Sequence, residues 1–353
     1  MKTEIVSKIS RLSRALLAAT LALAGAASVK GDGSSNFFNN NIAGVNLGNA
    51  SGGTGAGQRH WAIFSLGGNV TITDPNPYSP SGLPGSPTSD YSAAGSADVY
   101  GNVGIVGSGK LSMTNSYIDG FVTEATVGQL SANTITGGTN PHYLGSIGLD
   151  QAYLTQGYND AIAASAAALV AGSHGGTTIL STTTSTAVFT NTYAQFTTTG
   201  TPRIVNIPGG GYTEANLGIT DTGLAMAGKT YVLNISDLIL QGASAVLTLH
   251  GTATTNYIFN IDRYMTLAGG AKINIDGSSG LTAANVLYNV NQNSINGVQY
   301  DVTLSGGSQA SGIILATTRA VKETGDSKIF GEVIAKSVSL SGASNVINPL
   351  VSP

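Results

Sequence analysis

The sequence predicts an all-β fold, a parallel β-solenoid (β-helix) with irregular coils and one long α-helix packed alongside. Three observations predict it. A short phrase recurs within residues 231–348, further strand-like runs separate its copies, and a single segment near the middle of the chain changes to helical periodicity. An antiparallel sandwich, with chance similarity between its turns, is the alternative interpretation.

The recurring phrase is a short apolar alternation, a polar residue, a Gly-Ala or Gly-Gly pair, and then the start of a new strand. Alternation points every second side chain to one face, so the apolar residues lie inside and the glycine lies where the chain turns. The spacing between copies is irregular, which suits coils with insertions at their corners. The copies are Leu238–Val246, Met265–Ile273, Val302–Ala310 and Val338–Val346.

The composition is that of an exported β-rich protein. Charged residues make up 9% of the 353-residue chain, 48 residues are glycine, and 41% are apolar, which argues against disorder for most of the chain. Cysteine is absent from the sequence, so core burial and backbone ladders must hold the fold together without disulfides.

The first 26 residues have the pattern of a secretory signal peptide. Basic residues precede the apolar run Ala15–Ala26, which ends in a small-residue cleavage pattern and is too short for a permanent membrane span. Cleavage would leave 11 Lys and Arg against 17 Asp and Glu, a net charge of −6. We therefore expect secretion, no nucleic-acid partner, and no membrane insertion after signal cleavage.

The rest of the chain divides into a Gly/Ser/Asn-rich lead-in (residues 27–59), a single solenoid domain (60–348) and a short tail (349–353). The lead-in is expected to add one edge strand around Ile42–Leu47. The first strands of the domain are Trp61–Leu66 and Asn69–Thr73. Five prolines follow within residues 74–98, and because proline cannot donate to a strand ladder this segment is expected to be a loop.

The one predicted helix covers residues 149–171. Its apolar residues recur every three or four positions, alanine is abundant, and Gly172 follows as a C-cap. We expect this apolar stripe to lie on a sheet of the solenoid, with Tyr153 or Tyr158 packed against it. The stripe consists of Leu154, Tyr158, Ile162, Ala166 and Leu169.

Broad binding surfaces are the main functional candidates. The threonine-rich segment Thr177–Thr201 is expected to be either a strand pair with a hydroxyl-rich face or an exposed excursion, and its Thr182, Thr184 and Thr186 are candidates for a binding face. Tyr78 and Tyr91 of the proline-rich loop could stack on sugar rings.

Compact catalytic or metal sites are not predicted, and no cofactor is expected. An acid–base enzyme would need clustered carboxylates, whereas the candidates lie at strand ends or beside glycines, where Asp commonly satisfies turn backbone. The histidines have no acidic or cysteine neighbours in sequence that predict a metal site. Asn and Ser residues of the VLNIS, FNID and LYNVN phrases are expected to form internal polar ladders along the axis. The residues weighed are Asp237, Asp262, Arg263, Asp276 and Asp301, with His60, His142, His174 and His250.

Several phrases in this order resemble a known group of proteins. They are AIFSLGGNVTI, ADVYGNVGIVGSGKLSM and SYIDG, then the Ala-rich helix, and then VLNISDL, GLTAANVLYNV, SGIILA and IFGEVIAKSVSLSGA. Across about residues 60–348 the chain resembles the choice-of-anchor A family of bacterial surface adhesin-like domains, and its layout is similar to the ice-binding family of discontinuous β-solenoids. The resemblance implies a right-handed solenoid, exported, adhesive in the first family and ice-binding in the second. Two departures from these families are expected: no sorting signal is recognised in the sequence up to Pro353, and no regular Thr-x-Thr rank recurs across the coils.

The resulting expectation is a secreted, non-enzymatic adhesive or matrix-associated solenoid that binds an extracellular glycan or matrix protein through a broad face. Ice binding on the same fold is the alternative, and a polysaccharide-degrading β-helix enzyme is a third. A flat, rank-ordered Thr/Ser face would favour ice. A groove with clustered carboxylates would favour the enzyme.

Overall fold

The computed structural model describes residues 45–51, 61–73, 98–114, 116–119, 122–126, 142–144, 147–149, 151–172, 186–190, 204–207, 211–212, 230–276, 278, 280–291 and 300–348. The chain divides into two units, Met1–Ser34 and Ser35–Pro353, and every described residue belongs to the second. Within the described residues, no helix is long and apolar enough to cross a membrane.

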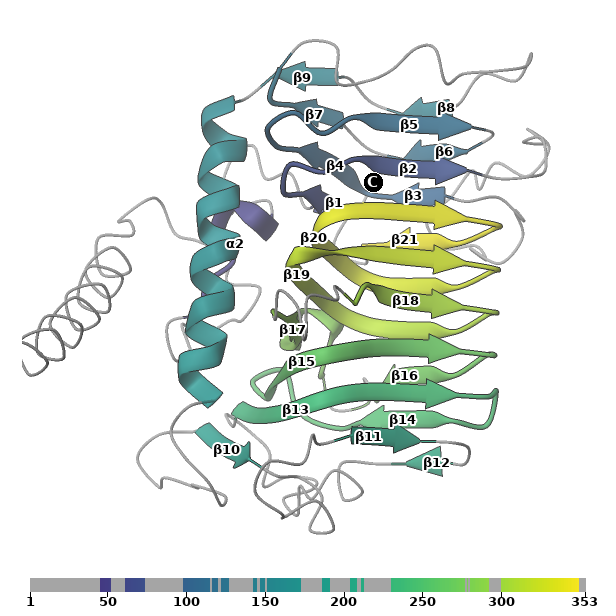
Figure 1. Cartoon of the computed structure of the whole chain (residues 1–353). Coiled ribbons are helices and arrows are strands. Elements are labelled where there is room, and N and C mark those ends of the chain that lie inside the picture. Colours follow the sequence, from purple (N-terminus) through teal and green to yellow (C-terminus); the bar gives the residue numbers. More distant parts are fainter. Residues whose placement is uncertain are drawn as a thin grey trace, which may run out of the picture. The chain divides into compact units, whose positions relative to one another are not determined.

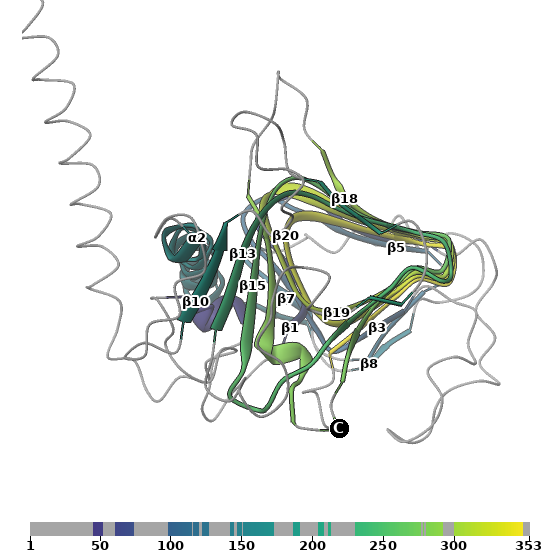
Figure 2. The ribbon, with the colours of Figure 1, turned by 90° about the horizontal axis from the view of Figure 1, so that it is seen from below.

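The described strands stack in parallel into a solenoid with three walls, which we name faces A, B and C (Figures 1 and 2). In the axial view of Figure 2 the chain runs clockwise from face A to B to C as it moves away from the viewer, so the solenoid is right-handed. This confirms the predicted fold class.

Face A lies beside the helix α2 (Gln151–Gly172). From one end of the stack to the other it contains β10 (Thr186–Thr190), the first halves of β13 (Thr230–Gln241) and β15 (Asn256–Ala268), β17 (Val286–Val290), the middle of β19 (Gln309–Thr324) and of β20 (Lys328–Ser341), β1 (Trp61–Ser65), β4 (Asn102–Ile105), β7 (Val122–Glu124) and β9 (Ile147–Leu149).

Face B follows in each coil and is the stack of long rightward arrows in Figure 1. It contains β11 (Ile204–Ile207), the second halves of β13 and β15, β18 (Val302–Ser305), the ends of β19 and β20, β2 (Val70–Thr73) and β5 (Leu111–Thr114).

Face C closes the coil. It contains β12 (Gly211–Tyr212), β14 (Val246–Leu249), β16 (Lys272–Ile275), the starts of β19 and β20, β21 (Asn345–Ile347), β3 (Asp98–Tyr100), β6 (Tyr117–Asp119) and β8 (His142–Leu144). Two short 3-10 helices complete the description, η2 (Gly48–Ser51) and η9 (Ala283–Asn285).

A column of glycines forms the corner between faces B and C. Gly269, Gly306, Gly325 and Gly342 have φ between 61° and 64°, a left-handed conformation that a side chain disfavours. The parallel ladder continues around this corner, because the Gly325 N–H donates to the Ser341 carbonyl at 3.2 Å. The prediction that the glycine of each repeat marks the turn is confirmed.

The interior is apolar, as the alternation predicted. Leu238, Leu267, Val302 and Leu340 are fully buried or nearly so, and they line the solenoid together with the other inward residues of the repeats. An aromatic column fills the wider coils, where neighbouring rings of Tyr231, Tyr257, Phe259 and Tyr288 have centroids 5.2–6.3 Å apart.

The stacking order differs from the order of the chain. The N-terminal strands β1, β2 and β3 lie on the C-terminal strands β20 and β21, with Ile63 paired to Val333 and Thr71 to Ser339. The side-chain amide of Asn348 donates to the Trp61 carbonyl at 2.6 Å across this junction. We call it the seam, and it places the two ends of the described chain in the middle of the stack.

The helix contacts face A through small residues, and the predicted stripe is wrong. Leu154 is buried as expected, but Tyr158, Ile162 and Leu169 are 38–41% exposed. The buried side consists mainly of alanines, because face A already presents large outward side chains that fill the space beneath the helix. Tyr153 does pack on Trp61, with ring centroids 6.2 Å apart. The contacting residues are Ala161, Ala164, Ala168 and Ala171 against Trp61, Phe64, Val232, Ile258 and Leu287.

A ladder of asparagines fastens the helix to face A. The Asn289 amide donates to Asn260 Oδ1 at 2.8 Å, and the Asn260 amide donates to Asn234 Oδ1 at 3.0 Å. Asn260 also donates to the Ala168 carbonyl at 2.8 Å, and the Ser165 hydroxyl donates to Asn289 Oδ1 at 2.7 Å. The predicted hydrogen bonding of like residues along the axis is confirmed for asparagine, but the ladder lies between face A and α2 and not inside the coil. It satisfies buried amides that would otherwise be costly.

The lead-in does not form the expected edge strand over its described residues. Asn46 Oδ1 instead accepts a hydrogen bond from the Gly48 N–H at 2.8 Å, and this local turn leads into η2. Val45, Leu47 and Ala50 are buried in the same cluster as α2.

Candidate binding face

Face B presents two ranks of outward side chains, because its in-register parallel strands stack equivalent positions. The central rank consists of Ile239, Thr266, Thr303, Lys322, Ser339, Thr71 and Ser112. The corner rank, next to the glycine corner, consists of Gln241, Ala268, Ser305, Thr324, Ser341, Thr73 and Thr114.

Strand geometry turns these ranks into a regular array. Parallel strands lie about 4.8 Å apart, and alternate residues along a strand about 6.6 Å apart, so the array repeats in both directions. Threonine is β-branched and stiff at χ1, which holds its methyl and hydroxyl in place. Neighbouring coils also interact directly, since the Thr303 hydroxyl donates to Thr266 Oγ1 at 3.2 Å.

As the sequence indicated, a strict Thr-x-Thr pattern occurs on the described strands of face B only at Thr71 and Thr73, but mixed ranks of threonine and serine are present. Serine replaces threonine at several positions, so Thr-x-Thr is only one of the forms that the rank takes. The seam also brings Thr71-x-Thr73 onto Ser339-x-Ser341, two segments far apart in the sequence. The most complete part of the array, made only of hydroxyl residues, spans this seam and contains Ser339, Ser341, Thr71, Thr73, Ser112 and Thr114.

Face C has the same backbone but different outward residues. One rank runs Val246, Lys272, Gln309, Lys328 and Asn345. Further along the strands, Thr248 and Asn274 are neighbours, and the Phe330 ring packs with Ile347 and Tyr100. Over its described side chains, this wall offers charges, amides and an aromatic patch, and no repeating short hydroxyls.

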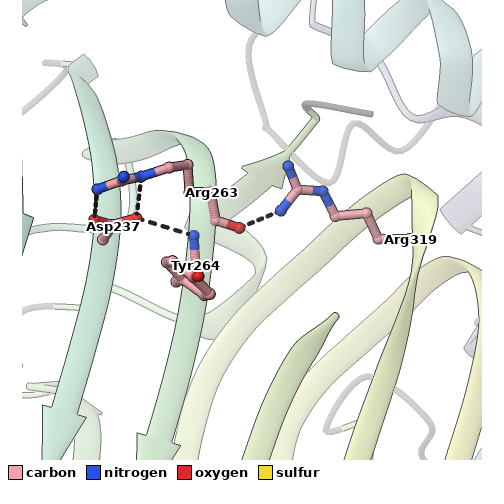
Figure 3. Close-up of polar contacts among 4 residues, drawn as sticks. All are labelled: Asp237, Arg263, Tyr264 and Arg319. Atoms are coloured by element: carbon pink, nitrogen blue, oxygen red, sulfur yellow. Dashed lines mark hydrogen bonds and ion pairs between the residues drawn. The ribbon is translucent and has the colours of Figure 1, made fainter. Parts of the chain in front are cut away.

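A polar network at the corner between faces A and B sets where face B begins (Figure 3). Arg263 pairs with Asp237, its Nε donating to Oδ1 at 2.9 Å, and the Tyr264 N–H donates to the same oxygen at 3.3 Å. The guanidinium of Arg319, 1% exposed, donates to the backbone carbonyls of Asp262, Arg263 and Tyr300. The strands change register here, and these bonds satisfy carbonyls that the bend removes from the ladder.

The acidic and histidine candidates lie in separate contacts. Asp237, Arg263 and the Asp262 backbone belong to the corner network, whereas Asp301 pairs with Lys322, Nζ to Oδ2 at 2.6 Å. Asp276 lies 3.5 Å from His250, so this histidine does have the acidic neighbour that the sequence did not predict. The Ser278 backbone N–H holds the pKa of Asp276 below its usual value. No group of three His, Asp or Glu among the described residues could hold a metal ion.

Most of the predicted binding residues lie outside the described part of the chain. These are Tyr78, Tyr91, Thr182 and Thr184, as well as His60 and His174. Thr186 begins β10 in face A, with its backbone paired to Thr230, and His142 begins β8 in face C. The two ranks of face B were missed, although the alternate Thr and Ser of the repeats were visible in the sequence.

Comparison with known proteins gives one local match in sequence and a similar layout in solved structures. No protein-family model matches the chain. An ice-binding protein of Flammulina populicola is 34% identical over 106 residues, which are 30% of this chain and 38% of that protein, so the match spans well under half of the relative. The crystal structure of an ice-binding protein from the Antarctic ascomycete Antarctomyces psychrotrophicus covers 86% of this chain and 97% of its own, with 14% identity and a TM-score of 0.44. A glycosylated ice-binding protein from an Arctic yeast covers 88% and 96%, with 16% identity and a TM-score of 0.45.

Proposed function

We propose that this chain is a secreted ice-binding protein and that face B is the surface that contacts ice. The single observation that carries the proposal is the array of hydroxyl side chains in two in-register ranks on face B. A crystal surface is itself a lattice, so a ligand of this kind requires contacts that repeat at fixed intervals. Stacked strands supply such intervals.

The chemistry of the array suits ordered water. Each threonine offers a hydroxyl that can donate and accept, beside a methyl group that water cannot bond to. Individually such contacts are weak, but a rigid array pays little entropy to present many of them together. Face C lacks this property, because Lys272 and Lys328 carry strongly hydrated charges on flexible stems.

The sequence match supports the same proposal. The relative that is 34% identical over 106 residues is named an ice-binding protein. The order of the two functions expected from the sequence is therefore reversed: ice takes first place, and the adhesive function with a glycan or matrix partner becomes the alternative outcome of the test. Secretion, proposed from the signal-peptide pattern, and the absence of enzymatic activity are part of the proposal.

The test is thermal hysteresis and ice-crystal shaping by residues 27–353 at high protein concentration. We compare wild type with Thr71→Lys, which places a long cation in the hydroxyl array, and with Thr248→Lys, the matched change on face C. Thr71→Lys should lower thermal hysteresis severalfold, because a long, strongly hydrated cation at the centre of the array would hold water away from the neighbouring hydroxyls. Thr248→Lys should leave it unchanged.

Two results would contradict the proposal. Unshaped ice with wild-type protein would reject ice binding and make a glycan and matrix-protein array the next experiment. Equal losses from the two lysine variants would retain ice binding but reject face B as its surface. Circular dichroism of both variants establishes that the solenoid is folded in each comparison.

A further inference from the structure

One charged side chain interrupts the hydroxyl ranks of face B over the described strands. Lys322 lies in the central rank between Thr303 of one neighbouring coil and Ser339 of the other. Its side chain is 53% exposed. An ammonium group is a compact, strongly hydrated charge on a flexible stem, and at this position it could spread its own water shell over both neighbours.

The structure holds this ammonium at one place. Lys322 Nζ lies 2.6 Å from Asp301 Oδ2, and the Asp301 side chain is 29% exposed. Asp301 directly precedes Val302, the first residue of β18, so it lies in the next coil at the beginning of a face-B strand. The Lys322 side chain therefore reaches toward the corner between faces A and B. This direction leads away from the glycine corner and from the corner rank beside it.

We propose that Asp301 is a positioning residue for the binding face: it holds the Lys322 ammonium at the edge of face B, so that the hydroxyls on both sides of Lys322 can meet ice. The inference rests on the proposed function of face B. Half-exposed ion pairs add little to folding stability. Positioning of the ammonium is therefore a role for this pair that is separate from stability.

An alternative role for Asp301 acts through Arg319 instead. Burial lowers the pKa of the Arg319 guanidinium below its usual value, and the Asp262 and Asp301 carboxylates oppose this effect, so removal of Asp301 could disturb the corner network. The two roles predict different behaviour when Lys322 is absent. If Asp301 acts on Lys322, its loss has no effect without the lysine; if it acts on Arg319, its loss has the same effect in either background.

The experiment is a double-mutant cycle measured by thermal hysteresis. The variants are Asp301→Asn, Lys322→Thr and the two combined, with Asp276→Asn as a matched loss of a half-exposed carboxylate near face C. Asp301→Asn should lower activity about two- to fivefold, since a pair of this kind shifts side-chain populations by no more than that. Lys322→Thr should exceed wild type because it completes the central rank. The combined variant should match Lys322→Thr, and Asp276→Asn should match wild type.

Each result decides something. Full activity in Asp301→Asn, or a combined variant as weak as Asp301→Asn, would overturn the positioning role while leaving ice binding in place. Wild-type protein without activity would overturn the proposed function and this inference with it. Urea unfolding midpoints, expected to be similar in all the variants, separate a loss of positioning from a loss of fold.

Discussion

Faces B and C are built on the same backbone plan and differ almost entirely in what they present. Both consist of short parallel strands from the same coils, and both meet at the same column of glycines. Their inward sides are apolar in the same alternation, apart from Glu323 on face B. On the outside, face B repeats threonine and serine, whereas face C mixes lysines, amides and an aromatic patch.

The comparison separates two tasks of the sequence. The inward residues and corner glycines fix the spacing of positions, which is common to both faces. The outward residues then decide whether that spacing presents one chemical group repeatedly. A regular backbone is therefore necessary for a lattice-like surface but does not create one.

The largest expected effect comes from breaking the corner where face B begins. Arg319→Met would leave the carbonyls of Asp262, Arg263 and Tyr300 buried without their donor. We expect the free energy of unfolding to fall by about 3 kcal/mol or more, because each unsatisfied buried group is costly. Urea denaturation measures this free energy of unfolding. Lys328→Met on face C is the control and should change it by less than about 0.5 kcal/mol; similar losses in both variants would contradict the role of the corner network.

The second prediction concerns Glu323, the buried carboxyl that distinguishes the inward side of face B from that of face C, together with a second buried carboxyl, Glu332. Glu323 points inward from face B with neither carboxylate oxygen hydrogen-bonded, and Glu332 is buried in the same state on face A. Burial raises the pKa of both carboxyls well above their usual 4.5. Above pH 4.5 the unfolded chain therefore loses protons that the folded chain keeps.

Stability should consequently fall as pH rises, by up to about 1.4 kcal/mol per pH unit for each carboxyl, until the folded groups ionise. Glu323→Leu removes one contribution, and the Glu323→Leu, Glu332→Leu double variant removes both. Urea midpoints between pH 4 and pH 8 check this. Asp326→Asn, at an exposed carboxylate of the glycine corner, should keep the wild-type slope. An unchanged slope in Glu323→Leu would show that the carboxyl is not buried as a neutral group.

The smallest expected effect comes from adding one threonine to the outward side of face B or of face C. Ala268 is a gap in the corner rank of face B, and Ala268→Thr would add one hydroxyl and one methyl to the array. We expect thermal hysteresis to rise about twofold, the value of one modest additional contact. Asn274→Thr on face C adds the same side chain where no array exists and should have no effect. A gain from both variants would mean that threonine content, and not its arrangement, determines activity.

Local patterns predicted the fold well. Alternation identified the inward residues, the glycines identified the corner, and the alanine-rich segment identified the helix. The side of the helix that packs was predicted wrongly, because size complementarity with Trp61 and Phe64 decided it and hydrophobicity did not. Small residues fit where the partner is already large.

The binding face could not be predicted from local patterns, because it depends on register between distant segments. Thr71 and Ser339 become neighbours only through the seam, and no spacing in the sequence reports that pairing. Composition indicated the threonine-dense segment 177–201. Face B instead gains its hydroxyls one or two at a time, from many short strands.

The seam has a consequence for how damage to the protein would be felt. In an ordinary stacked repeat, loss of the last strands shortens one end and spares the rest. Here residues 328–348 supply β20 and β21 at the middle of the stack, directly beneath the first strands of the domain. A chain that ended before residue 328 would lack the strand that joins β19 to β1 and β2, and with it the centre of the hydroxyl array. Under the proposed function, ice binding would therefore depend on the whole chain from Trp61 to Asn348, because the centre of the array needs strands from both ends of it.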